Sequence, residues 1–210
     1  IGFIFSIHIV QIMKTLFLVF IAVVAISLFP GCRHKEELKK SPVDQQEIIK
    51  EYGRETVAIT FATLSSELKK ALASGGVNQA VQYCNLKAIA LTDSLSKTRN
   101  VNIKRATDRP RNTNNLLDKD ERRVFEYYDQ AIKNGRPYSD TLVVYPKMKV
   151  YYSPIRINDL CLKCHGNPVQ MPGYSTIKNL YPSDDAIGYK VGDLRGLWSV
   201  SYYQEQSNNL

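Results

Sequence analysis

Five consecutive residues carry the clearest chemistry in this sequence: Cys161, Leu162, Lys163, Cys164 and His165. Cys-x-x-Cys-His is the attachment signature of c-type haem. Two thiols three positions apart can each add across one vinyl group of the porphyrin, and the adjacent imidazole is then held under the iron as its proximal ligand. We therefore predict one haem c, attached through Cys161 and Cys164, with His165 bound to the iron.

The same cysteine pair has two other interpretations, a thioredoxin-like redox pair and half of a zinc site. A redox Cys-x-x-Cys usually opens a helix in a βαβ unit, whereas here Pro168 and Pro172 follow closely. Structural zinc needs four ligands, and the expected domain, residues 43–210, has no second Cys/His pair. We therefore prefer haem attachment to either alternative.

The second axial ligand of such a haem has few candidates in the sequence. His8 and His34 lie within the first 34 residues, which we interpret as a leader and tether, so a bis-His site within the folded domain would need a second subunit. The remaining soft donors are Cys84, Met148 and Met171, which are thiol or thioether groups of the kind that bind haem iron. The spacing leaves Cys84, a methionine and an open distal site as alternatives.

The N-terminal residues predict export and a membrane anchor. Met13 and Lys14 precede an uncharged apolar run, residues 15–30, which is the order of a secretory signal. Gly31-Cys32 then resembles the lipobox of a bacterial lipoprotein, although Phe and Pro replace its usual Leu and small residue. The run is shorter than the ~20 residues that span a membrane, so we prefer a lipid on Cys32 to an uncleaved anchor.

These features divide the sequence into four parts. We expect residues 1–12 to be an over-extended translation that precedes the true start at Met13. A lipoprotein-type signal peptide is expected at 13–31, a tether at 32–42 and a c-type haem domain at 43–210. Haem c is attached outside the cytoplasm in bacteria, so both predictions indicate the periplasmic side of a membrane.

The composition is that of an ordinary globular protein, with 44% hydrophobic and 23% charged residues among 210. The formal charge is +8, and Lys14 is the one charged residue of the expected signal peptide. Because the basic residues are dispersed and the chain is expected to be exported, we do not expect a nucleic-acid partner. A positive surface suits an acidic redox partner protein or anionic lipid head groups.

Helical patterns dominate the first half of the expected domain. A helix is predicted over 41–74, because a cap residue and Pro open it and apolar residues then recur every three or four positions. Gly75-Gly76 is expected to end it. A second helix is predicted over 77–95, and its apolar, core-facing side includes Cys84.

Strand patterns dominate the second half. Residues 101–106 and 194–203 are predicted strands, and 142–154 is predicted to be a hairpin around a central Pro-Lys. A third helix, over 118–135, begins with a capping box. Residues 166–192 are rich in Pro and Gly and predict no regular element. Helices followed by antiparallel strands indicate an α+β fold.

Several stretches, taken in order, resemble the PAS-like c-type haem domain first described from a cyanobacterial protein of unknown function, the Tll-type haem domain. They are Ala80–Ala88, Arg111-Asn112 with Asn115 and Glu121, Tyr151–Ile155, Cys161–Gly166, Tyr181-Pro182 with Asp184, Ala186 and Gly188, and Gly192–Gly196. Their order and spacing make the resemblance specific over about residues 45–203. The sequence departs from the family pattern at Thr113, where Pro is usual, and at Leu197-Trp198, where smaller residues are usual.

The resemblance implies a PAS-like antiparallel sheet flanked by N-terminal helices, with a single covalently bound haem. It also implies axial ligation by the motif His and a distant Cys thiolate, which map to His165 and Cys84. Such a thiolate stabilises ferric iron and lowers the reduction potential. Related domains are also fused to signalling modules, so the resemblance implies redox sensing as readily as electron transfer.

Basic residues near residue 107 are candidates for contacts with the haem propionates. They are Lys104, Arg105, Arg109 and Arg111, and we assign this role first to Arg109 and Arg111. A solvated basic surface is the alternative for all four.

Together these features predict an exported, membrane-anchored monohaem cytochrome that transfers electrons to an unknown partner protein or senses redox state through a six-coordinate haem. A haem enzyme such as a peroxidase, or a gas sensor, needs an open distal site, and for an enzyme the scarcity of His argues against an acid/base residue there. We therefore do not expect an enzyme. A non-haem thiol, disulfide or zinc interaction lipoprotein is the third alternative.

Overall fold

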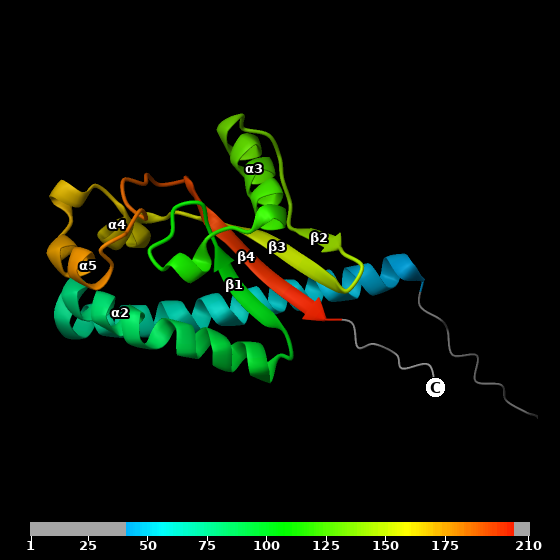
Figure 1. Ribbon diagram of the computed structural model, residues 1–210, viewed down its shortest axis with the longest axis horizontal. Helices are drawn as coiled ribbons and strands as arrows, with labels where there is room; N and C mark the ends of the chain where they lie inside the picture. The colour runs from blue at the N-terminus through cyan, green and yellow to red at the C-terminus, as the bar shows by residue number, and fades with distance from the viewer. Residues whose placement is uncertain (1–40, 204–210) are drawn as a thin grey trace, which may run out of the picture. The chain divides into compact units, whose positions relative to one another are not determined.

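The computed structural model describes residues 41–203 (Figure 1). Its elements are α2 (Pro42–Thr98), β1 (Asn102–Ala106), η1 (Thr113–Asn115), α3 (Lys119–Lys133), β2 (Thr141–Val144), β3 (Met148–Arg156), α4 (Asp159–His165), η2 (Pro168–Gln170), α5 (Tyr174–Leu180) and β4 (Leu194–Tyr203). The predictions for the extension, the signal peptide, lipidation of Cys32 and nearly all of the tether fall outside the described residues. Within 41–203 no helix combines the length and the hydropathy needed to cross a bilayer.

Helix α2 is a hairpin of two helical arms. Ser41 begins it with a capping box, in which the Ser41 hydroxyl and the Asp44 amide, and the Asp44 carboxylate and the Ser41 amide, are each 3.2 Å apart. Gly75 and Gly76 leave the helical conformation, and the φ of 66° at Gly76 lies in the left-handed region that glycine tolerates best. The arms lie side by side (Figure 1), which confirms the two helices predicted before and after the glycine pair.

Contacts near each end of the hairpin join the two arms of α2. Near the open end, Arg99 Nε donates to Thr56 Oγ1 at 2.9 Å, and its guanidinium lies 4.2 Å from the ring centroid of Tyr52. Near the glycine turn, the Tyr83 hydroxyl donates to the Glu67 carboxylate at 3.1 Å. The hairpin is therefore held at both ends, which positions its second arm for the site described below.

The four strands form one antiparallel sheet in the order β1-β4-β3-β2. This confirms the predicted strands, the hairpin and the α+β class. Strand β4 is buried on both faces, unlike a strand that has one face in solvent. Four consecutive residues of it are buried, namely Leu197, Trp198, Ser199 and Val200. The strand lies between β1 and β3 in the centre of the sheet, where both faces are covered.

Helices cover the two faces of the sheet (Figure 1). On one face α2 packs against Ile103, Tyr151, Trp198 and Val200, a cluster completed by partly buried residues of α2. The approach is close at Gly53, where a Cβ atom would lie 2.4 Å from Cγ of the Tyr151 ring. On the other face α3 packs its buried side chains against inward residues of β3 and β4.

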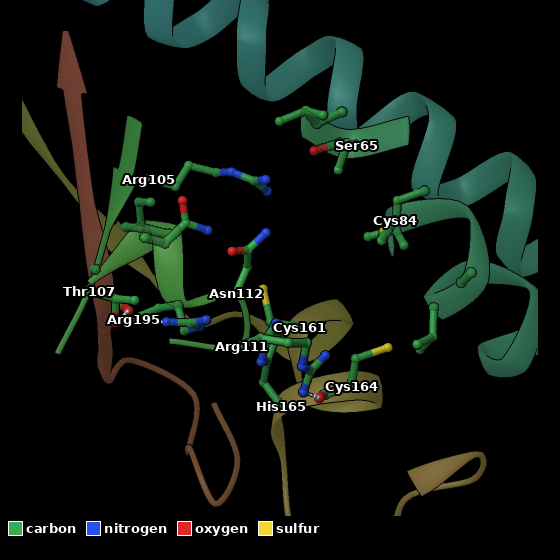
Figure 2. A pocket seen from close by; sticks show the side chains of 18 of the residues that line it. Ser65, Cys84, Arg105, Thr107, Arg111, Asn112, Cys161, Cys164, His165 and Arg195 are labelled. Atoms are coloured by element: carbon green, nitrogen blue, oxygen red, sulfur yellow. Dashed lines mark hydrogen bonds between the residues drawn. The ribbon is translucent and has the colours of Figure 1, made fainter. Parts of the chain in front are cut away.

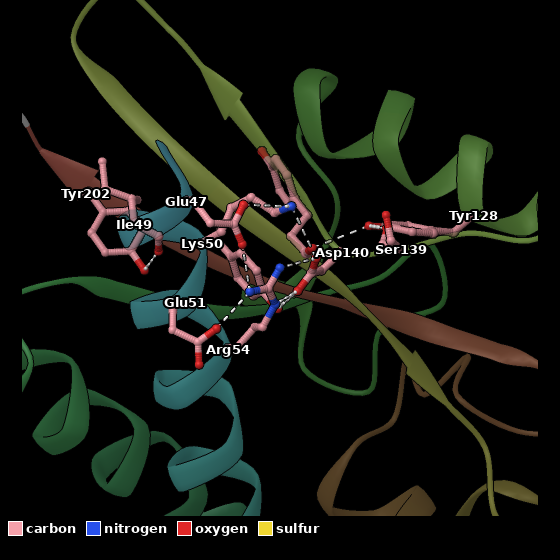
Figure 3. Close-up of polar contacts among 11 residues, drawn as sticks. Glu47, Ile49, Lys50, Glu51, Arg54, Tyr128, Ser139, Asp140 and Tyr202 are labelled. Atoms are coloured by element: carbon pink, nitrogen blue, oxygen red, sulfur yellow. Dashed lines mark hydrogen bonds and ion pairs between the residues drawn. The ribbon is translucent and has the colours of Figure 1, made fainter. Parts of the chain in front are cut away.

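Polar contacts join the first arm of α2 to the sheet near the start of β2 (Figure 3). Arg54 Nε lies 2.5 Å from Asp140 Oδ2, and the Tyr151 hydroxyl donates to the same oxygen at 2.9 Å. Lys50 lies 3.7 Å from the other carboxylate oxygen. These groups orient the hairpin relative to β3.

The segment between β3 and β4 is more regular than predicted. The cysteine motif lies in a short helix, α4, directly after a strand, and α5 occupies part of the stretch expected to be irregular. Ile177 of α5 is fully buried against Val81 and Met171, so tertiary packing on the hairpin stabilises a helix that local propensity does not indicate. Because β3 and β4 are antiparallel, the strand and helix do not make the βαβ unit of a thioredoxin-like redox site.

Candidate functional site

A cavity of about 290 Å³ lies between α2, α4 and the adjoining ends of β1 and β4 (Figure 2). Apolar side chains from both arms of α2 form one wall, among them Leu64, Leu68 and Val81, and Trp198 of β4 adds to it. The described lining includes three arginines and no acidic residue. The cavity is thus apolar with a positive wall.

Helix α4 brings the three motif residues to this cavity. Asn158 caps the helix by accepting a hydrogen bond from the Cys161 amide at 3.2 Å. Cys161 and Cys164 are one turn apart and share a face, and both line the cavity together with His165. Gly166 ends the helix where a Cβ atom would lie 2.7 Å from the carbonyl oxygen of Leu162.

The imidazole of His165 is oriented by a backbone carbonyl. Its Nδ1 lies 2.7 Å from the oxygen of Ala186, which can only accept a hydrogen bond, so we assign the proton to Nδ1 and leave Nε2 unprotonated. Burial and the nearby charges of Arg195 and Arg111 hold the pKa of His165 well below its usual range. A neutral imidazole with a free Nε2 is the form that binds metals.

Arg111 and Asp184 support that carbonyl. The carboxylate of Asp184 is fully buried and lies 3.1 Å from the Arg111 guanidinium, and it also accepts the amide of Ala186 at 3.0 Å. Arg111 Nη2 donates to the carbonyl oxygens of Cys164 at 2.6 Å and Ala186 at 3.3 Å. One ion pair therefore links the end of α4 to the loop that orients His165.

Of the three candidate distal ligands, Cys84, Met148 and Met171, the structure brings Cys84 to the cavity. Cys84 projects from the second arm of α2, across from α4 (Figure 2). Burial raises the pKa of its thiol, while the charges of Arg105 and Arg111 act in the opposite direction. Met148 pairs with Tyr203 at the far end of β3, and Met171 is buried in the cluster around Ile177.

Two of the predicted propionate contacts have other partners. Arg109 Nε donates to the carbonyl oxygen of Asp185 at 3.1 Å, Nη2 donates to that of Ile187, and Cζ lies 4.3 Å from the ring centroid of Tyr189. Lys104 forms an ion pair with Glu121 at 2.7 Å. Neither Arg109 nor Lys104 lines the described cavity, whereas Arg105 and Arg111, the other two predicted contacts, do.

Arg105 and Arg195 occupy the positive wall instead. They extend from β1 and β4 into the cavity (Figure 2). Arg195 Nη1 donates to Thr107 Oγ1 at 2.8 Å and to the carbonyl oxygen of Arg109 at 3.2 Å. The sequence analysis gave Arg195 no role. Arg195 lies within the stretch Gly192–Gly196 that carried part of the family resemblance, but only the pairing of β4 with β1 shows that its side chain reaches this wall.

The donor set does not gather around a bare metal ion. Among residues 41–203, no three His, Cys, Asp or Glu side chains are close enough together to hold one. Cys84 and the α4 residues instead face one another across the cavity. Such a separation does not suit a zinc ion held by all of them.

Comparisons with known proteins agree with this fold. A search of curated proteins finds no match. The crystal structure of the cyanobacterial haem protein Tll0287 matches with a TM-score of 0.57 at 21% identity, over 75% of this chain and 97% of that chain. At this identity the match establishes the fold, and it confirms the predicted α+β architecture. The Tll0287-like family model matches residues 34–202, and the chain therefore belongs to the Tll0287-like family.

Proposed function

We propose that this protein is a monohaem c-type cytochrome. Cys161 and Cys164 would hold the haem covalently, and His165 and Cys84 would be the protein ligands of its iron. The observation that carries the proposal is that these four side chains, which come from α4 and the second arm of α2, line one apolar cavity. The structural match to a haem protein and the family membership support it.

The residues present fit a haem. Two thiols share one face of α4, the adjacent imidazole keeps Nε2 free, and a third thiol lies across the cavity. The walls are apolar, and the guanidinium groups of Arg105 and Arg195 are available to balance carboxylates, whereas that of Arg111 is paired with Asp184. When bound, haem supplies a one-electron ferric–ferrous couple.

The protein's own residues orient the ligands and exclude competing ones. Ala186 and the Arg111–Asp184 pair hold His165 in its metal-binding tautomer. Cys84, if it binds the iron as a thiolate, would donate electron density and lower the reduction potential. If both His165 and Cys84 bind the iron, small gases and peroxide would have no open site, which would favour electron transfer or redox sensing over catalysis.

We also propose that the protein works on the periplasmic side of a membrane, anchored by a lipid on Cys32. The apolar run before Cys32 and the extracytoplasmic attachment of haem c support this location. Its partner is then another redox protein with an acidic surface, complementary to the formal charge of +8.

The first experiment is the absorption spectrum of the full chain, expressed with cytochrome c maturation machinery and recorded ferric and dithionite-reduced. We expect a Soret band, sharp α and β bands on reduction, and haem that stays attached after denaturation. A preparation without a Soret band would overturn the haem proposal and favour the thiol or zinc alternative.

The ligand assignment is tested with Cys84→Ser, with Met148→Leu as the matched control. We expect Cys84→Ser to alter the ferric absorption and EPR spectra and to open the ferrous iron to carbon monoxide, while Met148→Leu matches the wild type. Identical spectra for Cys84→Ser and wild type would remove Cys84 from the site. Carbon monoxide binding by the wild type would favour the gas-sensor or enzyme alternative.

A further inference from the structure

Two guanidinium groups on the cavity wall have no carboxylate partner in the part of the chain that the structure describes. Arg105 has no hydrogen-bond acceptor and no ion-pair partner among residues 41–203, although it is half-buried and lies on the cavity wall. Arg195 uses Nη1 for two neutral oxygens and forms no ion pair with a described residue. The third arginine of the wall, Arg111, differs because Asp184 neutralises it.

Such an arrangement requires an anion. A guanidinium stays protonated in proteins, and removing its charge from water without a counter-ion is unfavourable. Burial lowers the pKa of both Arg105 and Arg195, because the charged guanidinium is less favourable away from water. The described cavity lining contains no Asp or Glu. A potential anion of the lining, the Cys84 thiolate, interacts with the charge of Arg105 but is assigned to the iron in the proposed function. The charge that balances Arg105 and Arg195 is therefore expected from the group that fills the cavity.

The geometry favours carboxylates over other anions. Arginine presents a planar fork of donors that matches a carboxylate in two parallel hydrogen bonds. Arg105 and Arg195 come from neighbouring strands and point into the cavity from the same side, beside Asn112 (Figure 2). Asn112 adds a neutral amide, which can complete the coordination of an oxygen left by either guanidinium.

We propose that Arg105 and Arg195 form a carboxylate-binding subsite that holds the two propionates of the tetrapyrrole. This inference rests on the proposed haem function. In haem the propionates lie on the edge opposite the vinyl groups. If the vinyl edge is attached to α4, the propionates therefore face a different wall of the cavity. Arg105 of β1 and Arg195 of β4 lie on such a wall. Arg111 is then a positioning residue for His165 rather than a propionate ligand.

The test compares haem with its dimethyl ester, which lacks the propionate charges. The full-length double variant Cys161→Ala with Cys164→Ala keeps His165 and takes either porphyrin without a covalent bond, so absorbance titration gives two dissociation constants. We expect the parent to bind the free acid at least about thirtyfold more tightly than the ester, and Arg105→Gln or Arg195→Gln to reduce that ratio about tenfold each. Arg105→Lys keeps part of the preference because it keeps the charge.

Arg122→Gln is the matched control, because Arg122 is exposed on α3 and its loss removes the same charge without touching the cavity. We expect it to leave the ratio unchanged. Equal binding of acid and ester by the parent would overturn the subsite while leaving the haem site intact. Absence of a Soret band from wild-type protein would instead overturn the proposed function itself, so the two failures are distinguishable.

A second measurement does not depend on the double variant. In the holoprotein with covalent haem, the propionate bending bands in the resonance Raman spectrum report hydrogen bonding to the carboxylates. We expect these bands to shift in Arg105→Gln and Arg195→Gln and to stay in place in Arg122→Gln. Unshifted bands in both cavity variants, or thermal stabilisation of the holoprotein by a free dicarboxylate such as succinate through these arginines, would overturn the assignment.

Discussion

At the scale of single residues, the site depends on groups outside the cysteine motif. His165 is oriented by the carbonyl of Ala186, and that loop is in turn held by Asp184 and Arg111. Supporting contacts of this kind fix the tautomer of a metal-binding imidazole and set its direction. The motif therefore contains the proposed iron ligand His165, whereas a loop more than twenty residues away orients its imidazole.

Replacing Asp184 with Asn tests the buried ion pair with Arg111. The change leaves the buried Arg111 guanidinium without its counter-ion, and breaking a buried pair from one side costs about 3 kcal/mol. We expect the free energy of unfolding, measured by urea denaturation, to fall by about that amount. Asp185→Asn, at an exposed neighbouring position whose side chain forms no ion pair in the described chain, is the control; an equal loss there would contradict the assignment to the ion pair.

At the scale of elements, the hairpin α2 and the short helix α4 set the width of the cavity. One arm of α2 packs on the sheet, where Gly53 meets Tyr151, and the other carries Cys84. Helix α4 ends at Gly166 as soon as the motif is complete. A shift of either helix would change the separation between Cys84 and His165.

Replacing Gly53 with Ala tests the contact between α2 and the sheet. Alanine favours a helix over glycine by about 1 kcal/mol, but its Cβ atom would lie 2.4 Å from the Tyr151 ring. We expect the overlap to dominate and to lower the free energy of unfolding by about 1–3 kcal/mol. Ser66→Ala, at an exposed position of the same helix, is the control and should be neutral or stabilising. Stabilisation by Gly53→Ala would contradict the close approach of the helix to the Tyr151 ring.

Replacing Gly166 with Ala tests how α4 ends. The new Cβ atom would lie 2.7 Å from the Leu162 carbonyl oxygen, which belongs to the backbone and cannot rotate away. We expect the end of α4, and with it His165, to shift, so that the ferric spectrum changes and less haem is attached per chain. The pyridine haemochrome assay measures the attached haem, and a wild-type yield with a wild-type spectrum would contradict this.

At the scale of the described chain, the hairpin and the sheet are tied together by polar contacts around Asp140 (Figure 3). Burial alone would raise the pKa of Asp140, but hydrogen bonds from Arg54 and Tyr151 and the charges of Arg54 and Lys50 outweigh it and hold the pKa below its usual range. The carboxylate is thus stabilised in its charged form in the folded protein.

The sign of the pH dependence follows from that lowered pKa. The contribution of Asp140 is present above the unfolded pKa of about 3.9 and is lost as the pH falls through the lower folded pKa. We expect Asp140→Asn to be less stable than the wild type by about 1 kcal/mol at pH 7 and by less at pH 2, measured by urea unfolding. The exposed Asp93→Asn is the control, and a difference that stays constant with pH for Asp140→Asn would contradict the linkage.

The sequence alone determined the features that are encoded locally. Cap residues and apolar periodicity located α2, its glycine turn and α3, and alternating or β-branched runs located the four strands. The cysteine motif was recognisable because its ligands are adjacent, so spacing alone carries their chemistry. The order of short motifs was also enough for the family resemblance, which the family match over residues 34–202 confirms.

The tertiary structure decided which distant residues meet. Spacing could not choose among Cys84, Met148 and Met171, because that choice depends on how the hairpin packs against α4. From the sequence we assigned propionate contacts to Arg109 and no role to Arg195, because the pairing of β1 with β4, which brings Arg195 to the cavity, leaves no local pattern. For the same reason α5 and the two-sided burial of β4 were not foreseen: both result from contacts between segments far apart in the chain, and such contacts depend on the whole fold rather than on neighbouring residues.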